Sequence, residues 1–353
     1  MAWANKLVIA AGHAVSQPHH IRLEPCGDID ECLIVLKTLD QNEDRVYCSL
    51  REHYLDDPVL GYTASYAGVS EIMDETGYSR SYMRLSNLLR GFHEPKVMDV
   101  KLGVRTFLEV EEGYNVGRQD LYKRMAELYP SELSAEDHER GTITKRRFMA
   151  ARDANTTIGS LGFRIEGVAG LETEAKAFLP KVHCVEDACR VFSDFVVSAA
   201  SPGPQSSREP LLAASIAELL ASQVQDVHSA MQNSHFVKDH EFIGTSLLLI
   251  ADAFGHTAVF WIDFGKTVPL TMGTRLRHTG PWRPGSHEDG LFTGVEHLAC
   301  ALQSTSNELQ KESLSAMLGA GSGTCSASSL RLVPCHRSRS FLGSPFAAPC
   351  AVP

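Results

Sequence analysis

The 353-residue chain has no run of apolar residues that approaches the roughly 20 needed to cross a bilayer as a helix. It also lacks an excess of positive charge, because 33 Lys and Arg stand against 43 Asp and Glu, for a formal net charge of -10. A surface of that average sign does not attract nucleic acid or an anionic membrane. Any anionic ligand must therefore be held by a local group of basic residues.

The chain also lacks the paired cysteine spacing of a zinc site, although it has nine cysteines. Cys184 and Cys189 have four residues between them, and no second pair accompanies them. We interpret the cysteines as reduced thiols, which are typical of a reducing compartment. The apolar residues 7–11 end at Gly12 and are too few for a signal peptide, so we expect a cytoplasmic protein.

The hydrophobic patterns predict an α+β protein. Residues 32–36 form a β-branched, apolar run of strand length, and residues 43–54 have a helical pattern. Further strands are predicted at residues 68–73, 82–85, 97–103 and 162–165, and a buried hairpin at residues 246–250 and 258–262. Helices are predicted from residue 120, from residue 134, and over about 25 residues that end near residue 232.

Two charged residues directly follow apolar runs. Lys37 ends the first predicted strand, where its ammonium group can neutralise nucleotide phosphates. Taken alone, such a lysine is more often a solvated residue at a sheet edge. Asp263 follows the last predicted strand and precedes Phe264 and Gly265, and a carboxylate at a rigid strand end can hold Mg²⁺. The simpler alternative is an aspartate that begins a turn.

Asp99 and Lys101 lie two residues apart on a predicted strand and therefore share one of its faces. Unpaired charges on a half-buried strand are costly to desolvate. In a cleft, the Asp99 carboxylate can accept the proton of an attacking hydroxyl while Lys101 binds the transferring phosphoryl group. The alternative is an ion pair on an exposed strand.

The chain has one dense group of basic residues. Residues 140–152 contain five Lys or Arg and no acidic residue. In a chain of negative average charge, this run is the expected site for a polyphosphate, which needs several convergent donors. Arg118, Lys123 and Arg124 can extend the same site. A solvated helical face or a nuclear-import patch is the alternative.

These elements together resemble the inositol polyphosphate kinase family. The family signature P-x-x-x-D-x-K-x-G is matched by Pro95, Asp99, Lys101 and Gly103. Residues 244–248 resemble the family's Ser-Ser-Leu-Leu element, and residues 262–267 its Ile-Asp-Phe-Gly-Lys-Thr element, in the family's order. Residues 104–109, 120–152 and 161–167 are most similar to the branch of inositol 1,4,5-trisphosphate 3-kinases. The similarity extends from about residue 33 to about residue 305.

The resemblance implies the fold and the division of the chain. We expect the two-lobed α+β kinase-like fold that the family shares with SAICAR synthase, with an all-helical insert that binds the substrate. The expected parts are an N-terminal ATP-binding lobe (residues 1–90), a C-terminal catalytic lobe (91–117 and 156–314), the helical insert (118–155) and a tail (315–353). The tail is expected to be disordered, because it is rich in Gly, Ser, Ala, Pro and Cys and has no periodicity.

The resemblance also implies ATP and Mg²⁺ as cofactors and inositol 1,4,5-trisphosphate as the acceptor, phosphorylated at its 3-hydroxyl. By this likeness, Asp99 and Lys101 are the catalytic residues. The nucleotide is expected to contact Lys37, Ser86, Asn87, Leu88, Asp99 and Asp263, and the metal Asp263 and Ser246. The acceptor is expected to contact Lys101, Arg118, Lys123, Arg124, Lys145, Arg147, Phe148, Arg152 and Lys266.

The chain departs from the family pattern at several positions. Ser86 and Asn87 stand where the family more often has Gln-Asp, Phe148 replaces a usual Tyr, and Ala169 stands where the branch often has a lysine near ATP. A broader multikinase and a family member that binds inositol phosphates without transfer therefore remain as alternatives. A protein kinase does not fit, because the His-Arg-Asp and Ala-Pro-Glu elements are both absent. Calmodulin regulates some family members through a segment that overlaps residues 120–128.

Overall fold

The computed structural model describes residues 21–23, 33–73, 77–110, 116–169, 179, 182–201 and 210–319. The chain divides into two units, residues 1–314 and residues 315–353. The described part of the second unit, residues 315–319, is the end of helix α11 (Leu291–Gly319), so the segment expected to be a disordered tail begins as helix. Within the described ranges, no helix is both long and apolar enough to cross a membrane.

The first unit begins with a four-stranded antiparallel sheet in the order β1-β2-β4-β3. Its strands are β1 (Ile21–Leu23), β2 (Ile34–Thr38), β3 (Tyr66–Met73) and β4 (Ser79–Ser86). Helix α2 (Gln41–His53) follows β2 and starts at Asp40, whose carboxylate accepts the backbone N–H groups of Asn42 and Glu43. The strands predicted at residues 68–73 and 82–85 are confirmed. Lys37 lies on the second strand of this sheet, so its interpretation as a sheet-edge residue is wrong.

A second antiparallel sheet has the order β11-β10-β5-β8 and forms the centre of the unit. Its strands are β5 (Lys96–Leu102), β8 (Phe163–Ala169), β10 (Ser246–Ala251) and β11 (Thr257–Ile262). Every residue of β10 is buried, which explains why its sequence is continuously apolar after Ser246 rather than alternating. The predicted hairpin is confirmed by the direct pairing of β10 with β11.

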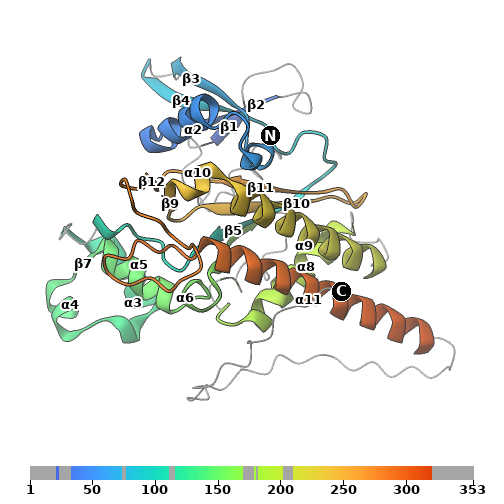
Figure 1. Ribbon diagram of the computed structural model, residues 1–353. Helices are drawn as coiled ribbons and strands as arrows, with labels where there is room; N and C mark the ends of the chain where they lie inside the picture. The colour runs from blue at the N-terminus through green and yellow to red at the C-terminus, as the bar shows by residue number, and fades with distance from the viewer. Residues whose placement is uncertain are drawn as a thin grey trace. The chain divides into compact units, whose positions relative to one another are not determined.

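Long helices lie along this central sheet (Figure 1). They are α8 (Val185–Ala199), α9 (Pro210–Asn233) and α11. Their apolar residues share the main hydrophobic core with strands β5, β8, β10 and β11. Phe192, Leu220, Leu298 and Trp261 are each less than 1% exposed in that core. The core therefore holds the central sheet rigidly, and the site residues carried by its strands are held with it.

Smaller elements complete the unit. Helix α10 (His235–Lys238) precedes a two-stranded sheet of β9 (His240–Phe242) and β12 (Thr267–Pro269). Two short 3₁₀ helices are formed by Pro58–Tyr62 and Pro130–Glu132.

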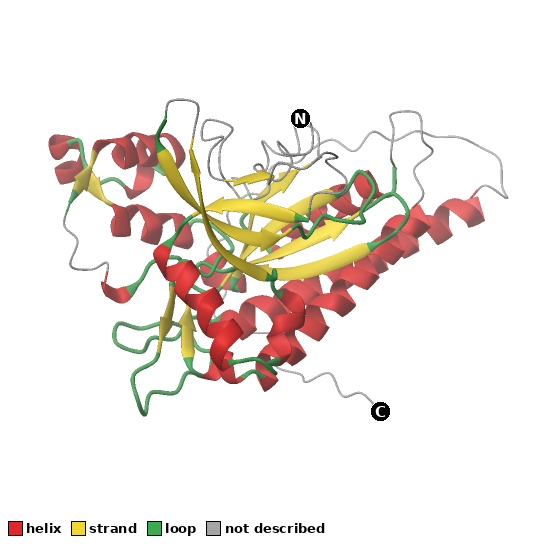
Figure 2. Ribbon diagram, turned by 90° about the horizontal axis from the view of Figure 1, so that it is seen from above, coloured by secondary structure: helices red, strands yellow, loops and turns green. Residues whose placement is uncertain are grey.

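Residues 117–161 form a group of short helices with a core of their own. The elements are β6 (Gly117–Arg118), α3 (Gln119–Leu128), α4 (Ala135–Arg140), β7 (Ile143–Thr144), α5 (Lys145–Ala154) and α6 (Ile158–Leu161). Met125, Ile143, Phe148 and Ala151 make up this small core. The group lies at the left in both Figure 1 and Figure 2, beside the central strands. All residues of the small core lie within 117–155, so we call residues 117–155 the helical insert; α6 connects it to β8.

The insert is mainly helical but contains the short β6–β7 ribbon. Ser134 begins α4 with a full capping box, in which its side chain and that of Asp137 each bond the other's backbone N–H, so the predicted helix start is confirmed. Thr144 caps α5 in a simpler way, by accepting the Arg147 backbone N–H. The Thr144 cap fixes where α5 begins and hence which of its residues face the central sheet.

Candidate active site

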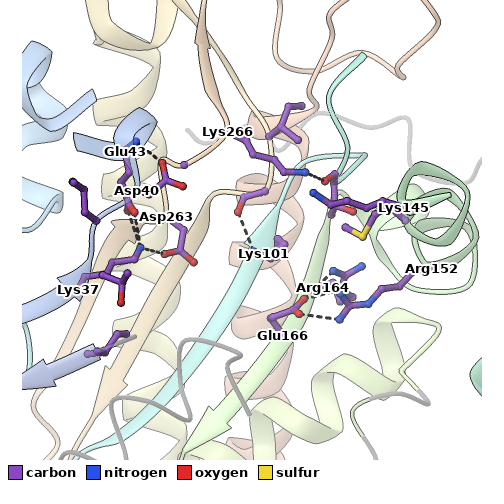
Figure 3. A pocket seen from close by; sticks show the side chains of 18 residues that line it. Lys37, Asp40, Glu43, Lys101, Lys145, Arg152, Arg164, Glu166, Asp263 and Lys266 are labelled. Carbon is purple, nitrogen blue, oxygen red and sulfur yellow. Dashed lines mark hydrogen bonds and ion pairs between the residues drawn. The ribbon is translucent and has the colours of Figure 1, made fainter. Parts of the chain in front are cut away.

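A pocket of about 510 Å³ lies between the N-terminal sheet, the central sheet and the helical insert. Its charged lining residues are Lys37, Asp40, Glu43, Lys101, Lys145, Arg152, Arg164, Glu166, Asp263 and Lys266. Figure 3 shows two sides: Lys37, Glu43 and Asp263 on one, Lys145, Arg152, Arg164 and Glu166 on the other, with Lys101 between them. The structure therefore brings together residues that are more than 200 positions apart in the sequence.

The first side is a lysine held between two carboxylates. Lys37 Nζ lies 2.7 Å from Asp263 Oδ1 and 2.8 Å from Glu43, which comes from the first turn of α2. Burial acts to lower the pKa of Lys37, but the charges of Asp263 and Glu43 outweigh it and raise that pKa. The lysine is therefore a permanent cation, and its side chain is still 20% exposed.

Asp263 occupies an unusual backbone conformation. It has φ of 67°, in the left-handed region that few residues other than glycine adopt. The following Phe264 is fully buried and packs edge-on against Tyr47 and Trp261, so it anchors this turn in the main core. Backbone strain of this kind persists where the surrounding structure over-determines it, often at functional sites. The packing of Phe264 thus aims the Asp263 carboxylate into the pocket.

Asp99, the predicted base, is a buried carboxyl group, and neither it nor Ser246 is among the residues that line the pocket. It is 1% exposed on β5, between β10 and β8, so the alternative of an ion pair on an exposed strand is wrong. Burial raises the pKa of Asp99 to about 7. The positive charge of Lys101 acts to lower this pKa, whereas the negative charges of Asp263 and Glu166 act to raise it. The buried Ser246 hydroxyl on the adjacent strand β10 acts to lower the pKa of Asp99 through a hydrogen-bonding interaction.

Such a carboxyl group changes its protonation state near neutral pH, which suits a proton acceptor. Lys101, two residues along the strand, lines the pocket and donates to the carbonyl of Gly244 at 3.0 Å. Strand β5 therefore carries a candidate base and a candidate phosphate ligand side by side.

The second side of the pocket combines the helical insert with β8. Lys145 and Arg152, at the two ends of α5, both line it. Arg152 donates to Glu166 at 2.8 Å, and Glu166 also accepts from Arg164 at 2.8 and 3.1 Å. Lys266, which follows the Asp263 turn, lines the pocket too. This side has an excess of positive charge, as an anionic ligand requires.

Helix α5 is anchored to the loop that follows β5. Asp153, 5% exposed, accepts the backbone N–H of Thr106 at 2.8 Å and its hydroxyl at 2.8 Å. Arg164 donates to the same carboxylate at 3.3 Å. The Thr106 carbonyl in turn accepts a hydrogen bond from Lys266 Nζ at 2.9 Å. One loop therefore holds both the insert helix and a pocket lysine.

The other basic residues predicted for the acceptor do not line this pocket. Arg118 is half-exposed and pairs with its neighbour Asp120 at 2.6 Å, and Arg147 pairs with Asp137 at 2.6 Å. Phe148 is 2% exposed in the core of the insert. The remaining two, Lys123 and Arg124, are exposed on α3. Arg118 and Arg147 are thus paired with acids of the insert itself, and Arg124 lies over the Phe148 ring at 5.5 Å. The role of these five residues as acceptor ligands stays a prediction.

The predicted hinge, Ser86 to Leu88, connects β4 to the segment before β5 and is also absent from the pocket lining. Asn87 N–H donates to the Leu33 carbonyl at 2.8 Å, and its side chain accepts the N–H of Leu89 at 3.0 Å. Ala169, at the end of β8, is fully buried. Adenine binding at this turn stays a prediction.

Several pocket residues were missed in the sequence. Asp40, Glu43, Arg164 and Glu166 all line the pocket. The helical pattern of α2 contained Glu43, but nothing in that pattern indicated a buried carboxylate facing Lys37. Residues 161–167 are similar to the family, but no pattern in them indicates that Arg164 or Glu166 is a charged group directed into a pocket.

The sequence comparisons decide the family. The model of the family described as "Inositol polyphosphate kinase" matches residues 82–303, which include the signature residues on β5, strand β8 and the Asp263 turn. The chain belongs to the inositol polyphosphate kinase family. The resemblance seen in the sequence is thereby confirmed, and so is the α+β class of its fold.

Within this family, curated relatives similar to the chain are inositol-trisphosphate 3-kinases. Inositol-trisphosphate 3-kinase A of Homo sapiens is 34% identical over 276 residues, covering 77% of this chain and 55% of that protein. The Caenorhabditis elegans homolog is 33% identical, covering 74% and 49%. Inositol-trisphosphate 3-kinase C of Mus musculus is 33% identical, covering 76% and 37%. The chain thus spans between about a third and just over half of the length of these relatives.

Solved structures are similar to the chain as well. The crystal structure of an inositol phosphate multikinase from S. cerevisiae, in complex with ADP and Mn²⁺, has a TM-score of 0.49 and 19% identity. The match covers 77% of this chain and 98% of that chain.

Proposed function

We propose that this protein transfers the γ-phosphoryl group of ATP to the 3-hydroxyl of inositol 1,4,5-trisphosphate, giving inositol 1,3,4,5-tetrakisphosphate. The observation that carries the proposal is the single pocket that joins Lys37 and Asp263 on one side to Lys101, Lys145, Arg152 and Lys266 on the other. Membership of the family and the names of the 3-kinase relatives support the choice of reaction and acceptor.

The nucleotide is assigned to the side of Lys37 and Asp263. A fixed cation beside a carboxylate is the pair of groups that phosphoryl transfer requires next to the nucleotide phosphates. Among the described residues, no cluster of three or more His, Cys, Asp or Glu side chains can hold a metal ion by itself. A lone carboxylate fits Mg²⁺, which commonly binds one or two carboxylates together with substrate phosphates. Asp263, with the Ser246 hydroxyl nearby on β10, would hold Mg²⁺, which neutralises phosphate charge when bound.

The acceptor is assigned to the side of the helical insert. Lys145 and Arg152 on α5, Lys101 on β5 and Lys266 would bind its phosphates. Asp99 would take the proton of the attacking hydroxyl, since its raised pKa suits a base that works near neutral pH. Lys101 would stabilise negative charge on the transferring group. Transfer of this kind depends on position and electrostatics more than on covalent chemistry.

The direct test is incubation of the purified protein with ATP, Mg²⁺ and inositol 1,4,5-trisphosphate, followed by chromatographic identification of the product. We expect a tetrakisphosphate with a new 3-phosphate. Asp99→Asn and Lys101→Ala are the negative controls, and each is expected to remove turnover while the protein remains folded. Turnover retained in either variant contradicts the assignment of these residues.

A panel of acceptors separates this reaction from the two alternatives. A multikinase would phosphorylate tetrakis- and pentakisphosphates at rates comparable to the trisphosphate. A family member without transfer would bind inositol phosphates and form no product. The extended helical insert, which forms one wall of the pocket, is the feature that favours a restricted acceptor.

We also propose that calmodulin binds residues 120–128, which requires helix α3 to leave its packed position in the insert. Met125 is 1% exposed, and Leu121 and Tyr122 pack against the same core of the insert. A calmodulin complex on the apolar side of α3 would therefore have to draw this helix out of that core. Calcium-dependent retention of the protein on immobilised calmodulin tests it, with Met125→Glu as the variant expected to abolish retention.

We also propose a cytoplasmic location. Cys48, Cys184 and Cys189 carry free thiols, which is typical of a reducing compartment. Fractionation of cells that express the protein tests this.

A further inference from the structure

Glu166 is a carboxylate in the wall of the pocket side that the proposed function assigns to a polyanion. It lies on β8 beside the insert, and its side chain is 15% exposed toward the pocket that it lines (Figure 3). An acid in an anion-binding wall opposes the binding of the ligand as a whole. Its presence there needs a reason other than affinity.

The position of Glu166 is set by a β-bulge. Asp99 pairs with Gly167 and Val100 pairs with Ile165, so Glu166 is the extra residue between two successive pairs of the β5–β8 ladder. Bulges next to active sites re-aim a side chain that a regular strand would direct elsewhere. This bulge lies directly opposite the Asp99 backbone, and the negative charge of Glu166 contributes to the raised pKa of Asp99.

The carboxylate of Glu166 is fixed in place and permanently charged. Arg152 Nη2 donates to it at 2.8 Å, and Arg164 donates through Nη2 at 2.8 Å and Nε at 3.1 Å. Burial acts to raise the pKa of Glu166, but the positive charges of Arg164, Arg152 and Lys101 outweigh it and lower that pKa. Two arginines from different elements thus hold one negative charge at this wall.

We propose that Glu166 determines acceptor specificity, by repelling acceptors that carry an additional phosphate beside Arg152 and by accepting a hydrogen bond from a hydroxyl there. A fixed charge discriminates in this way because a hydroxyl can donate to a carboxylate, whereas a phosphate placed against it meets a like charge in a poorly solvated site. The inference rests on the proposed function and adds the residue that limits the phosphate number of the acceptor.

Glu166→Gln tests the charge with little change in shape, since the glutamine carbonyl can still accept from one arginine. We measure displacement of a labelled inositol phosphate by inositol hexakisphosphate, and kcat/KM for inositol 1,4,5-trisphosphate and for an inositol pentakisphosphate. In the variant we expect about tenfold tighter binding of the hexakisphosphate and about a tenfold rise in the pentakisphosphate to trisphosphate ratio of kcat/KM, with KM for ATP unchanged. Unchanged hexakisphosphate affinity and ratio overturn the proposal.

Glu136→Gln is the matched control. It removes one negative charge from an exposed ion pair with Arg140 on the insert, and neither residue is part of the pocket lining. We expect this variant to keep the wild-type ratio. Equal changes in both variants would show that the net charge of the protein, and not the charge at the wall, sets the preference, and they would overturn the proposal.

Misfolding of Glu166→Gln and failure of the proposed function can both be distinguished from failure of the Glu166 proposal. If thermal unfolding shows that Glu166→Gln does not fold, Glu166→Asp replaces it. The aspartate keeps the negative charge but holds it one methylene farther from the acceptor, so we expect a smaller rise in the pentakisphosphate to trisphosphate ratio of kcat/KM. A wild-type ratio in Glu166→Asp overturns the proposal. If the wild-type protein transfers phosphate to no inositol phosphate, the proposed function fails. The hexakisphosphate displacement, which needs no turnover, then still decides the role of Glu166.

Discussion

Asp99 is a buried carboxyl group whose ionisation has opposite effects on stability and on the proposed chemistry. Its pKa is raised by burial to about 7, so the folded protein holds this proton more tightly than the unfolded chain does. The resulting stability is fully present below the ordinary carboxyl pKa of about 4 and is lost as the pH rises through about 7. At pH 8 the folded protein therefore contains a destabilising charge.

The substitution Asp99→Asn removes this buried charge and tests its effect on stability and on turnover. We expect the variant to lose kinase turnover and to gain stability over the wild type, with a gain about 1–3 kcal/mol larger at pH 8 than at pH 5. Urea unfolding at the two pH values measures this difference. Met98→Leu, a buried and uncharged neighbour on β5, is the control and is expected to show no such pH dependence. A gain that is equal at both pH values would contradict a buried, ionised Asp99.

At the scale of the element, the contact between α11 and the turn before β8 leaves no room for a side chain. A Cβ atom added to Gly294 on α11 would lie 2.0 Å from the Gly162 carbonyl oxygen, which belongs to the backbone and cannot rotate away. We expect Gly294→Ala to destabilise the protein by about 1–3 kcal/mol because the helix must shift. Denaturant titration followed by circular dichroism measures the change.

Gly159→Ala, on the neighbouring short helix α6, is the control for Gly294→Ala. Its added Cβ would meet only the Asp153 carbonyl at 3.5 Å, an ordinary contact. We expect stability within about 1 kcal/mol of the wild type, since alanine favours a helix. Similar losses in both variants would show that the contact between α11 and the Gly162 turn is not tightly packed.

Individual strands and helices can be predicted from the sequence where a local pattern specifies them. Strands β10 and β11 are predictable because a continuous apolar run of this length is typical of a buried strand. Helix α4 is predictable because Ser134 and Asp137 form a local cap at its start. Lys37 could be placed at a strand end, but its partners Glu43 and Asp263 depend on how α2 and β11 meet. The Glu166 bulge is a property of strand pairing, which no local pattern specifies.

The basic run of residues 140–152 is likewise a feature whose contacts the local sequence does not specify. Its composition indicated an anion site, and the structure does direct Lys145 and Arg152 into the pocket. Arg140 instead pairs with Glu136, and Arg147 with Asp137, two acids of α4 that the count of bases left out. Which bases of a run face a ligand depends on the helix phase and on nearby acids, so charge density predicts the region and not its individual contacts.

At the scale of the whole described unit, the pocket is where the N-terminal sheet meets the central sheet. Lys37 of β2 reaches Asp263 beyond β11, and Asn42 of α2 donates to the carbonyls of Gly265 and Thr267 at 3.2 and 2.9 Å. A nucleotide bound on this side would touch both sheets at once, so its binding should stabilise the unit as a whole. At a ligand concentration 100 times Kd, the gain is about 2.7 kcal/mol.

This gain should depend on the carboxylate at position 263. Asp263→Asn is the suitable change, since asparagine tolerates the left-handed φ of 67° and keeps the side-chain shape. We expect thermal unfolding of the wild type to shift upward with ATP only when Mg²⁺ is present, and the shift to disappear in the variant. Stabilisation by inositol 1,4,5-trisphosphate, which the proposed function assigns to the opposite side of the pocket, serves as the control and should persist. A full Mg²⁺-dependent shift in Asp263→Asn would mean that the metal is held elsewhere, and the nucleotide would then have to be reassigned within the pocket.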